Sequence, residues 1–156
     1  MQIAVLGAGM VGRAIAMDLS KDFEVTSFDL NPANLQELRK RNKSIQTVTV
    51  NLAQYENFEH WLAPFDLVVT AVPGYIGYKT LETVIQAGKN VVDISFFPED
   101  AMLLDKLAKE KGVTVIADCG VAPGMSNLIL GRYNAEMKVT AFECYVGGLP
   151  KERKPP

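Results

Sequence analysis

The sequence contains few of the residues that bind metals or cross-link secreted proteins. Its 156 residues include two cysteines and one histidine. The cysteines, Cys119 and Cys144, lie far apart without CxxC spacing, and with His60 they do not form the pattern of a metal site. We therefore predict no metal site and two reduced thiols, as is usual in the cytoplasm.

Long apolar runs and a large charge imbalance are also absent. No stretch approaches the roughly 20 apolar residues of a membrane span. The apolar start of the chain has no basic segment and is interrupted by glycines, unlike a secretory signal. The formal net charge is −2, which argues against nucleic acid or an anionic membrane as a partner. We expect a soluble, cytoplasmic protein.

The chain does show a regular alternation of strand and helix patterns. Apolar, β-branched runs predict strands at residues 3–6, 24–28, 47–50, 66–71, 90–94 and 113–117. Between them, apolar residues at helical spacing, such as Val11, Ile15 and Leu19, predict helices. This pattern predicts an α/β fold, a doubly wound parallel sheet of the Rossmann type with helices on both faces. We assign residues 1–136 to this domain.

Two predicted helices have clear end signals. Asn31 and Pro32 suit the cap and first position of one helix. Pro98 and the acids after it suit the start of another, which Gly112 would end.

The end of the chain has a different pattern. Residues 139–146 predict a strand, residues 147–150 a turn, and residues 151–156 form a basic, proline-rich tail. A domain is not expected to stop on such a segment. We therefore interpret residues 137–156 as the beginning of a truncated second α+β domain.

The first candidate site is a glycine-rich turn between a predicted strand and a predicted helix. The turn matches GxGxxG, in which the glycines permit a tight turn, close approach of a pyrophosphate and close packing of helix on strand. Free N–H groups at the helix start would then bind the phosphates. The candidate cofactor-binding residues are Gly7, Ala8, Gly9, Met10, Val11 and Gly12.

Asp29 is the second cofactor candidate. It ends the second predicted strand near the ~20-residue spacing expected for the acid that binds the ribose hydroxyls. A carboxylate there repels a 2′-phosphate, and Leu30, not arginine, follows it, so NAD is favoured over NADP. The alternative role is a helix cap, and the two roles are compatible.

Other cofactor contacts follow from the expected topology. Ligands of doubly wound sheets lie over the carboxyl ends of the strands. The candidates at those ends are Asn51, Leu52, Ala71, Val72, Pro73, Gly74 and Ser95, with Phe96 beside it. The alternative for each is an ordinary loop residue.

A second motif, DCGVAPGMSN at residues 118–127, follows the sixth predicted strand. Its glycines and proline predict a rigid bend, after which a helix would point its N-terminus at the crevice, where a substrate carboxylate can bind. The candidate substrate-binding residues are Cys119, Gly120, Ser126 and Asn127. The alternative is a strand-to-helix turn with no role beyond geometry.

Together, these motifs make the chain resemble the saccharopine dehydrogenase family, and within it most closely the lysine 6-dehydrogenase branch. The resemblance covers almost the whole chain and rests on GAGMVGRAIA, the segment from Asp29, the Val72–Gly74 turn, VDIS at residues 92–95, DCGVAPGMSN and GGLP at residues 147–150. It implies a Rossmann domain before a substrate and dimerisation domain of which residues 137–156 are the start. It also implies a homodimer that acts on an amino acid.

The resemblance further implies hydride transfer from a carbon that bears an amine to NAD or NADP. In the lysine branch this is the ε-carbon of L-lysine; in the alternative, saccharopine branch the nitrogen is a secondary amine. Asp93 and Asp118 are candidate catalytic bases by location, or else they cap turns. Cys119 is better interpreted as a packed thiol than as a nucleophile.

Two other functions are compatible with the same glycine-rich motif. An NAD-sensing regulatory domain without catalysis would share the glycine turn and the acid, but it does not need the second motif. Another two-domain amino-acid or aldehyde dehydrogenase is the remaining alternative.

Overall fold

The computed structural model describes residues 1–147, which fall into two compact units. The first is Met1–Cys119, and the second begins at Gly120. The helix Met125–Glu136, assigned above to the Rossmann domain, belongs to the second unit. The predicted domain end at residue 136 is not tested by this division and stays a prediction.

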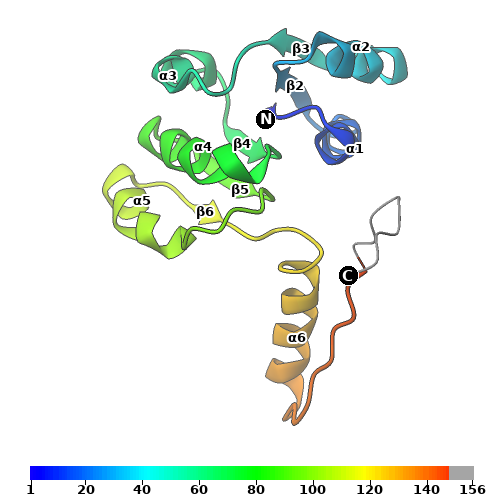
Figure 1. The fold of residues 1–156 in the computed structure, drawn as a ribbon, viewed down its shortest axis with the longest axis vertical. Coiled ribbons are helices and arrows are strands. Elements are labelled where there is room, and N and C mark those ends of the chain that lie inside the picture. The colour runs from blue at the N-terminus through cyan, green and yellow to red at the C-terminus, as the bar shows by residue number, and fades with distance from the viewer. Residues whose placement is uncertain (148–156) are drawn as a thin grey trace, which may run out of the picture. The chain divides into compact units, whose positions relative to one another are not determined.

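The first unit is a six-stranded parallel sheet in the order β3-β2-β1-β4-β5-β6. This is the Rossmann strand order, so the predicted fold class is confirmed. The order reverses between β1 and β4, and Figure 1 shows helices on both sides of the strands. The strands are β1 Gln2–Leu6, β2 Glu24–Asp29, β3 Gln46–Thr49, β4 Leu67–Thr70, β5 Asn90–Asp93 and β6 Val115–Ile116. The α-helices of this unit are α1 Met10–Leu19, α2 Pro32–Arg41, α3 Phe58–Leu62, α4 Gly74–Gln86 and α5 Asp105–Lys111.

Burial on both faces explains why the strands are apolar at consecutive positions. In β1, Ile3 and Val5 pack with residues of α1 and α2, such as Ala16 and Leu38. The alternate residues of β1 pack in a separate cluster with α3 and α4 on the opposite face. Successive side chains of a strand point to opposite faces, so each face receives its own core.

The helix-end predictions are largely confirmed. The Asn31 side chain accepts a hydrogen bond from the N–H of Ala33, and Gly112 ends α5 with a left-handed φ of 65°. The helix predicted after Pro98 begins later than expected. Asp100 caps a short 3-10 turn, Ala101–Leu104, by accepting from the N–H of Met102, and α5 follows it.

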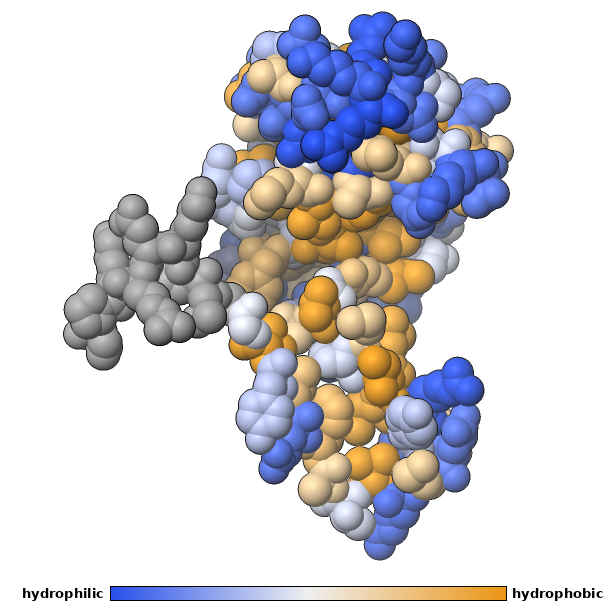
Figure 2. Space-filling model, turned by 90° about the vertical axis from the view of Figure 1, so that its right-hand side faces the viewer, coloured by the Kyte–Doolittle hydropathy of each residue, from blue (hydrophilic) through white to orange (hydrophobic). Residues whose placement is uncertain are grey.

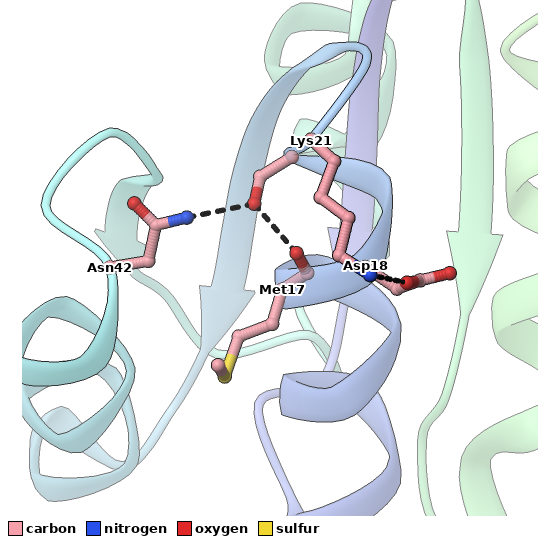
Figure 3. A network of polar contacts seen from close by, with 5 residues as sticks. Met17, Asp18, Lys21 and Asn42 are labelled. Carbon is pink, nitrogen blue, oxygen red and sulfur yellow. Dashed lines mark hydrogen bonds and ion pairs between the residues drawn. The ribbon is translucent and has the colours of Figure 1, made fainter.

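The C-terminal ends of α1 and α2 are joined by a small polar network, shown in Figure 3. The amide of Asn42 donates to the hydroxyl of Ser20 at 2.9 Å, and that hydroxyl donates to the carbonyl of Met17 at 2.8 Å. Lys21 and Asp18 form an exposed ion pair beside it. The Ser20–Asn42 bond connects the two helices on one face of the sheet.

The second unit contains α6, Met125–Glu136, which buries none of its residues within the described chain. Figure 2 shows apolar and polar side chains together on its surface, at the bottom of that view. The strand predicted at residues 139–146 is wrong, since residues 138–147 form no regular structure. A strand requires a partner to accept and donate its backbone hydrogen bonds, and the described chain offers none there. The expected turn, apart from Gly147, and the basic tail lie outside the described residues.

Within residues 1–147, no helix has the length and apolar character required to cross a lipid bilayer.

Candidate functional site

A cavity of about 590 Å³ lies over the carboxyl ends of the central strands of the first unit. Five segments of the chain line it, one at the carboxyl end of each of the strands β1 to β5. The lining residues are Gly7, Gly9, Met10, Val11, Gly12, Asp29, Leu30, Asn34, Asn51, Leu52, Ala53, Ala71, Val72, Pro73, Gly74, Tyr75, Ile76, Ile94, Ser95 and Phe96. This is the crevice in which open α/β sheets bind their ligands.

The three glycines of the first motif have different surroundings. Gly7 has a φ of 103°, and a Cβ there would lie 2.4 Å from the carbonyl oxygen of Ala71. A Cβ on Gly12 would lie 1.9 Å from the carbonyl oxygen of Gly7. A Cβ on Gly9 would meet no atom within 4 Å, so the backbone there borders open space. Gly7 and Gly12 are therefore required by packing, whereas Gly9 leaves room for a ligand.

Asp29 connects the end of β2 to the glycine-rich turn. One carboxylate oxygen accepts from the N–H of Ala8 at 2.6 Å, and the other from the N–H of Asn31 at 2.7 Å. The side chain is half-buried and still lines the cavity. Each carboxylate oxygen has a further lone pair, so Asp29 retains acceptor capacity for hydroxyl groups of a ligand.

The opposite end of the cavity is formed by the turn after β4 and the segment after β5. A Cβ on Gly74 would lie 1.9 Å from the carbonyl oxygen of Phe96, so the two segments approach too closely for any other residue. The hydroxyl of Ser95 accepts from the N–H of Val72 at 3.2 Å. Two aromatic side chains, Tyr75 and Phe96, are 88% and 78% exposed beside this end.

The structure brings the predicted cofactor residues together: all of them line the cavity except Ala8. Ala8 is buried and takes part through its N–H bond to Asp29. Asn51 uses its side-chain oxygen to accept from the N–H of Ala53, which leaves its amide NH2 group as the possible donor to a base. Phe96, expected with Ser95 at the same strand end, lines the cavity as well, whereas sequence reasoning missed Asn34, Ala53, Tyr75, Ile76 and Ile94. Most of these lie directly beside predicted residues, and adjacency was the signal that could have found them.

Asp93, Asp118 and Cys119 do not line the cavity. Asp93 is fully buried, and burial, its main influence, raises the pKa of its carboxyl, while hydrogen bonding from Thr70 acts in the opposite direction. Asp118 is exposed and has a left-handed φ of 57°. Burial, followed by the nearby Asp93 and Asp118, raises the pKa of the Cys119 thiol. A thiol held in its neutral form is a poor nucleophile. The two catalytic assignments stay predictions.

The second unit contains the remaining substrate candidates, Gly120, Ser126 and Asn127. Hydrogen bonds connect Ser126 and Asn127 to each other and to the bend before α6. The side-chain oxygen of Asn127 accepts from the N–H of Gly124 and from the hydroxyl of Ser126, both at 3.2 Å. The N–H of Ser126 donates to the carbonyl of Val121. These contacts close the bend that begins α6. Such contacts are what the alternative interpretation expects, in which the motif is a turn with no role beyond geometry. Substrate binding by these residues stays a prediction.

A dinucleotide fits this donor set. The cavity falls in the size range of about 300–1,000 Å³ that is usual for small-molecule sites. The open backbone at Gly9 and the start of α1 offer N–H groups to a pyrophosphate. On one side of the cavity, Asp29 can accept hydrogen bonds from the hydroxyls of one ribose. On the other side, the lining residues of the turn after β4 and of the segment after β5 form a mainly apolar wall.

Comparison with known proteins gives the same assignment for the domain. A family model described as the saccharopine dehydrogenase NADP binding domain matches residues 3–116. This range covers most of the chain, from β1 through β6.

Two curated relatives and one solved structure illustrate the similarity. The chain is 26% identical over 156 residues to a saccharopine dehydrogenase [NADP(+), L-glutamate-forming] of Pyricularia oryzae, covering 95% of the chain and 34% of that protein. It is 26% identical over 157 residues to the mitochondrial alpha-aminoadipic semialdehyde synthase of Rattus norvegicus, covering 96% of the chain and 17% of that protein. The apo saccharopine dehydrogenase (L-Glu forming) of Saccharomyces cerevisiae has the same fold, with a TM-score of 0.76, 23% identity and coverage of 86% of this chain and 31% of that one. The chain thus spans about a third or less of the proteins that it matches.

Proposed function

The chain belongs to the family of saccharopine dehydrogenase NADP-binding domains, and from this premise we propose that it is the cofactor-binding part of an NAD-dependent oxidoreductase that oxidises an amino-acid amine at the carbon next to nitrogen. The family binds pyridine nucleotides and acts on CH–NH donors. The observation that carries the proposal is the cavity itself, which joins the glycine-rich turn, Asp29 and the wall of residues after β4 and β5.

The preference for NAD rests on Asp29. Its carboxylate sits where the ribose hydroxyls of the adenosine half would lie, and a negative charge there disfavours a 2′-phosphate. Leu30 follows it, and the basic residues Arg39 and Lys40 line a different hollow. The description of the family and the name of the Pyricularia relative both specify NADP. A preference for NAD over NADP would therefore distinguish this chain from its relatives.

The residues of the chain would bind and orient the cofactor. Backbone N–H groups at the start of α1 would hold the pyrophosphate, and Asp29 would accept from the ribose hydroxyls. Val72, Pro73 and the buried Ser95 would support the nicotinamide, with Tyr75 and Phe96 limiting access of water from the side. The bound cofactor supplies the hydride acceptor.

For the substrate, saccharopine or another secondary amine is favoured over free L-lysine. The first expectation from the sequence was a lysine 6-dehydrogenase. The relatives reported above carry saccharopine dehydrogenase or aminoadipic semialdehyde synthase names. The reacting amine must be neutral to release hydride, and the proposed base in this chain is Asp118, an exposed carboxylate two residues after β6.

The test has two parts. Titration of the chain with NADH and with NADPH, followed by nicotinamide fluorescence, should give tighter binding of NADH. The longest natural polypeptide that contains this chain should then reduce NAD in the presence of saccharopine. Turnover with L-lysine alone would favour the lysine branch. Tight NADH binding with no turnover on any amino acid would favour the NAD-sensing domain instead.

A further inference from the structure

The fully buried carboxyl of Asp93 has no cationic partner within the described residues. It ends β5, and its partner across the sheet is Thr70, which ends β4. The two side chains form a hydrogen bond, and both residues are 0% exposed. Burial of an acid without a cation is costly, because desolvation disfavours its charged form, so this position calls for a structural or functional explanation.

Asp93 is also connected to the segments on either side of it. The N–H of Ile94 donates to the carbonyl of Thr70 at 3.1 Å, and the N–H of Cys119 donates to the carbonyl of Asp93 at 3.0 Å. The residue therefore joins the ends of β4 and β5 and the segment after β6. It lies immediately below the cavity, whose lining includes the next residues, Ile94 and Ser95.

Ser95 extends this connection to the turn after β4. Its hydroxyl accepts from the N–H of Val72, so the Thr70–Asp93 bond and the Val72–Ser95 bond, two residues further along, join the same two segments. The second carboxyl oxygen, Oδ2, makes no hydrogen bond to any residue that the structure describes. Val72 and Ser95 belong to the wall assigned above to the nicotinamide, on the side of β1 away from Asp29.

We propose that Asp93 is a positioning residue which, through its bond to Thr70 and beside the Val72–Ser95 bond, fixes the turn from Ala71 to Gly74 against β5 and so orients the nicotinamide half of the cofactor. This proposal rests on the proposed function. It assigns Asp93 an indirect role, since a fully buried carboxyl below the cavity floor does not touch the reacting atoms.

The proposal predicts that loss of the Asp93 contact weakens binding of the nicotinamide half but not of the adenosine half. NADH contains both halves, whereas ADP-ribose lacks the nicotinamide. In Asp93→Ala, the affinity for NADH should fall about tenfold, the loss expected for one buried hydrogen-bonded group, while that for ADP-ribose changes less than about twofold. Asp93→Asn keeps a neutral group that accepts from Thr70, and it should retain both affinities.

Thr70→Val tests the same connection without changing the acid. It removes the hydroxyl that bonds Asp93 and should reproduce the selective loss of NADH binding. Thr80→Val is the matched control: Thr80 is also a fully buried threonine, but its hydroxyl has no partner within the described residues. This variant should bind both ligands as the unmodified chain does.

The outcomes separate the two proposals. If the unmodified chain binds neither NADH nor NADPH, the proposed function fails before Asp93 is tested. If it binds NADH, but Asp93→Ala and Thr70→Val leave NADH binding intact or weaken NADH and ADP-ribose equally, the positioning role is overturned. Should Asp93→Ala not fold, Thr70→Val alone decides the question, with Thr80→Val as its control.

Discussion

A carboxylate oxygen of Asp29 accepts a hydrogen bond of 2.6 Å from the backbone N–H of Ala8, across 21 residues of sequence. The residue expected to bind the ribose thus also holds the glycine-rich turn that is expected to bind the pyrophosphate. A charged acceptor strengthens such a bond. This bond therefore couples the two parts of the proposed adenosine site.

This double role makes Asp29 the first residue to substitute. Asp29→Ala removes the ribose acceptor and the bond to Ala8, so NADH affinity should fall about tenfold or more. NADPH should lose less, because the repulsion of its 2′-phosphate disappears as well, and the ratio of the two affinities should approach one. Fluorescence titration with both cofactors measures this. Asp18→Ala, which removes an exposed acid that does not line the cavity, is the charge-matched control. Equal affinity of the unmodified chain for NADH and NADPH would contradict this account of Asp29.

The second and third glycines of the motif, Gly9 and Gly12, predict opposite defects. In Gly9→Ala, the new methyl group meets no protein atom, and the φ of −63° suits alanine, so the unfolding free energy should stay within about 1 kcal/mol of the unmodified chain. Cofactor binding should be lost, because the methyl group occupies the approach of the pyrophosphate. In Gly12→Ala, the methyl group lies 1.9 Å from the carbonyl oxygen of Gly7, and stability should fall by about 3 kcal/mol.

Urea unfolding and NADH titration of both variants check this pair. A Gly9→Ala chain that is stable and binds NADH normally would show that no phosphate approaches this part of the turn. A fully stable Gly12→Ala chain would show that α1 can move away from β1 at little cost.

The sequence was sufficient to predict the sheet and most of the cavity, because both depend on local patterns. The strands are buried on two faces, so β1 and β4 are apolar at consecutive positions and are easily recognised. The glycine turn has a spacing that can be read directly. Contacts such as Asp29 with Ala8, or Asp93 with Thr70, join residues more than twenty positions apart and leave no pattern in the sequence. They follow from which strands become neighbours.

The prediction that failed concerned a segment whose structure depends on a partner. Residues 139–146 have the composition of a strand, but β structure forms only when another strand satisfies the backbone groups. Composition predicts the preference of a segment and cannot predict whether the pairing is present. The wall residue Tyr75 was missed although it directly follows the predicted Gly74, because its aromatic side chain alone does not indicate whether it is exposed at a cavity or buried.

The environment of Cys119 predicts slow alkylation. Burial first, and then the neighbouring Asp93 and Asp118, raise the pKa of this thiol above its ordinary value of 9.0. In a Cys144→Ser variant, which leaves Cys119 as the single cysteine, the iodoacetamide rate at pH 8 should be about tenfold below that of the urea-unfolded chain. The rate should continue to rise beyond pH 9 without a plateau. A plateau below pH 8 would indicate a stabilised thiolate and would reopen a nucleophilic role for Cys119.

The raised pKa of Asp93 predicts a specific dependence of stability on pH. Because the folded state binds this proton more tightly than the unfolded state, the contribution of Asp93 to stability is fully present below its ordinary pKa of 3.8. It is lost as the pH rises through the higher pKa of the folded state.

Other carboxyls also titrate in this range, so the useful quantity is the difference in unfolding free energy between Asp93→Asn and the unmodified chain. That difference should move in favour of the variant as the pH rises from 4, by at most about 1.4 kcal/mol per pH unit, and then level off. Thr70→Val removes a hydrogen bond that lowers the pKa of Asp93, so in this background the change should extend to higher pH. Urea unfolding from pH 4 to pH 9 of the unmodified chain, Asp93→Asn, Thr70→Val and the double variant gives the two differences. A difference that does not vary with pH would mean that Asp93 titrates alike in the folded and unfolded states, despite its burial.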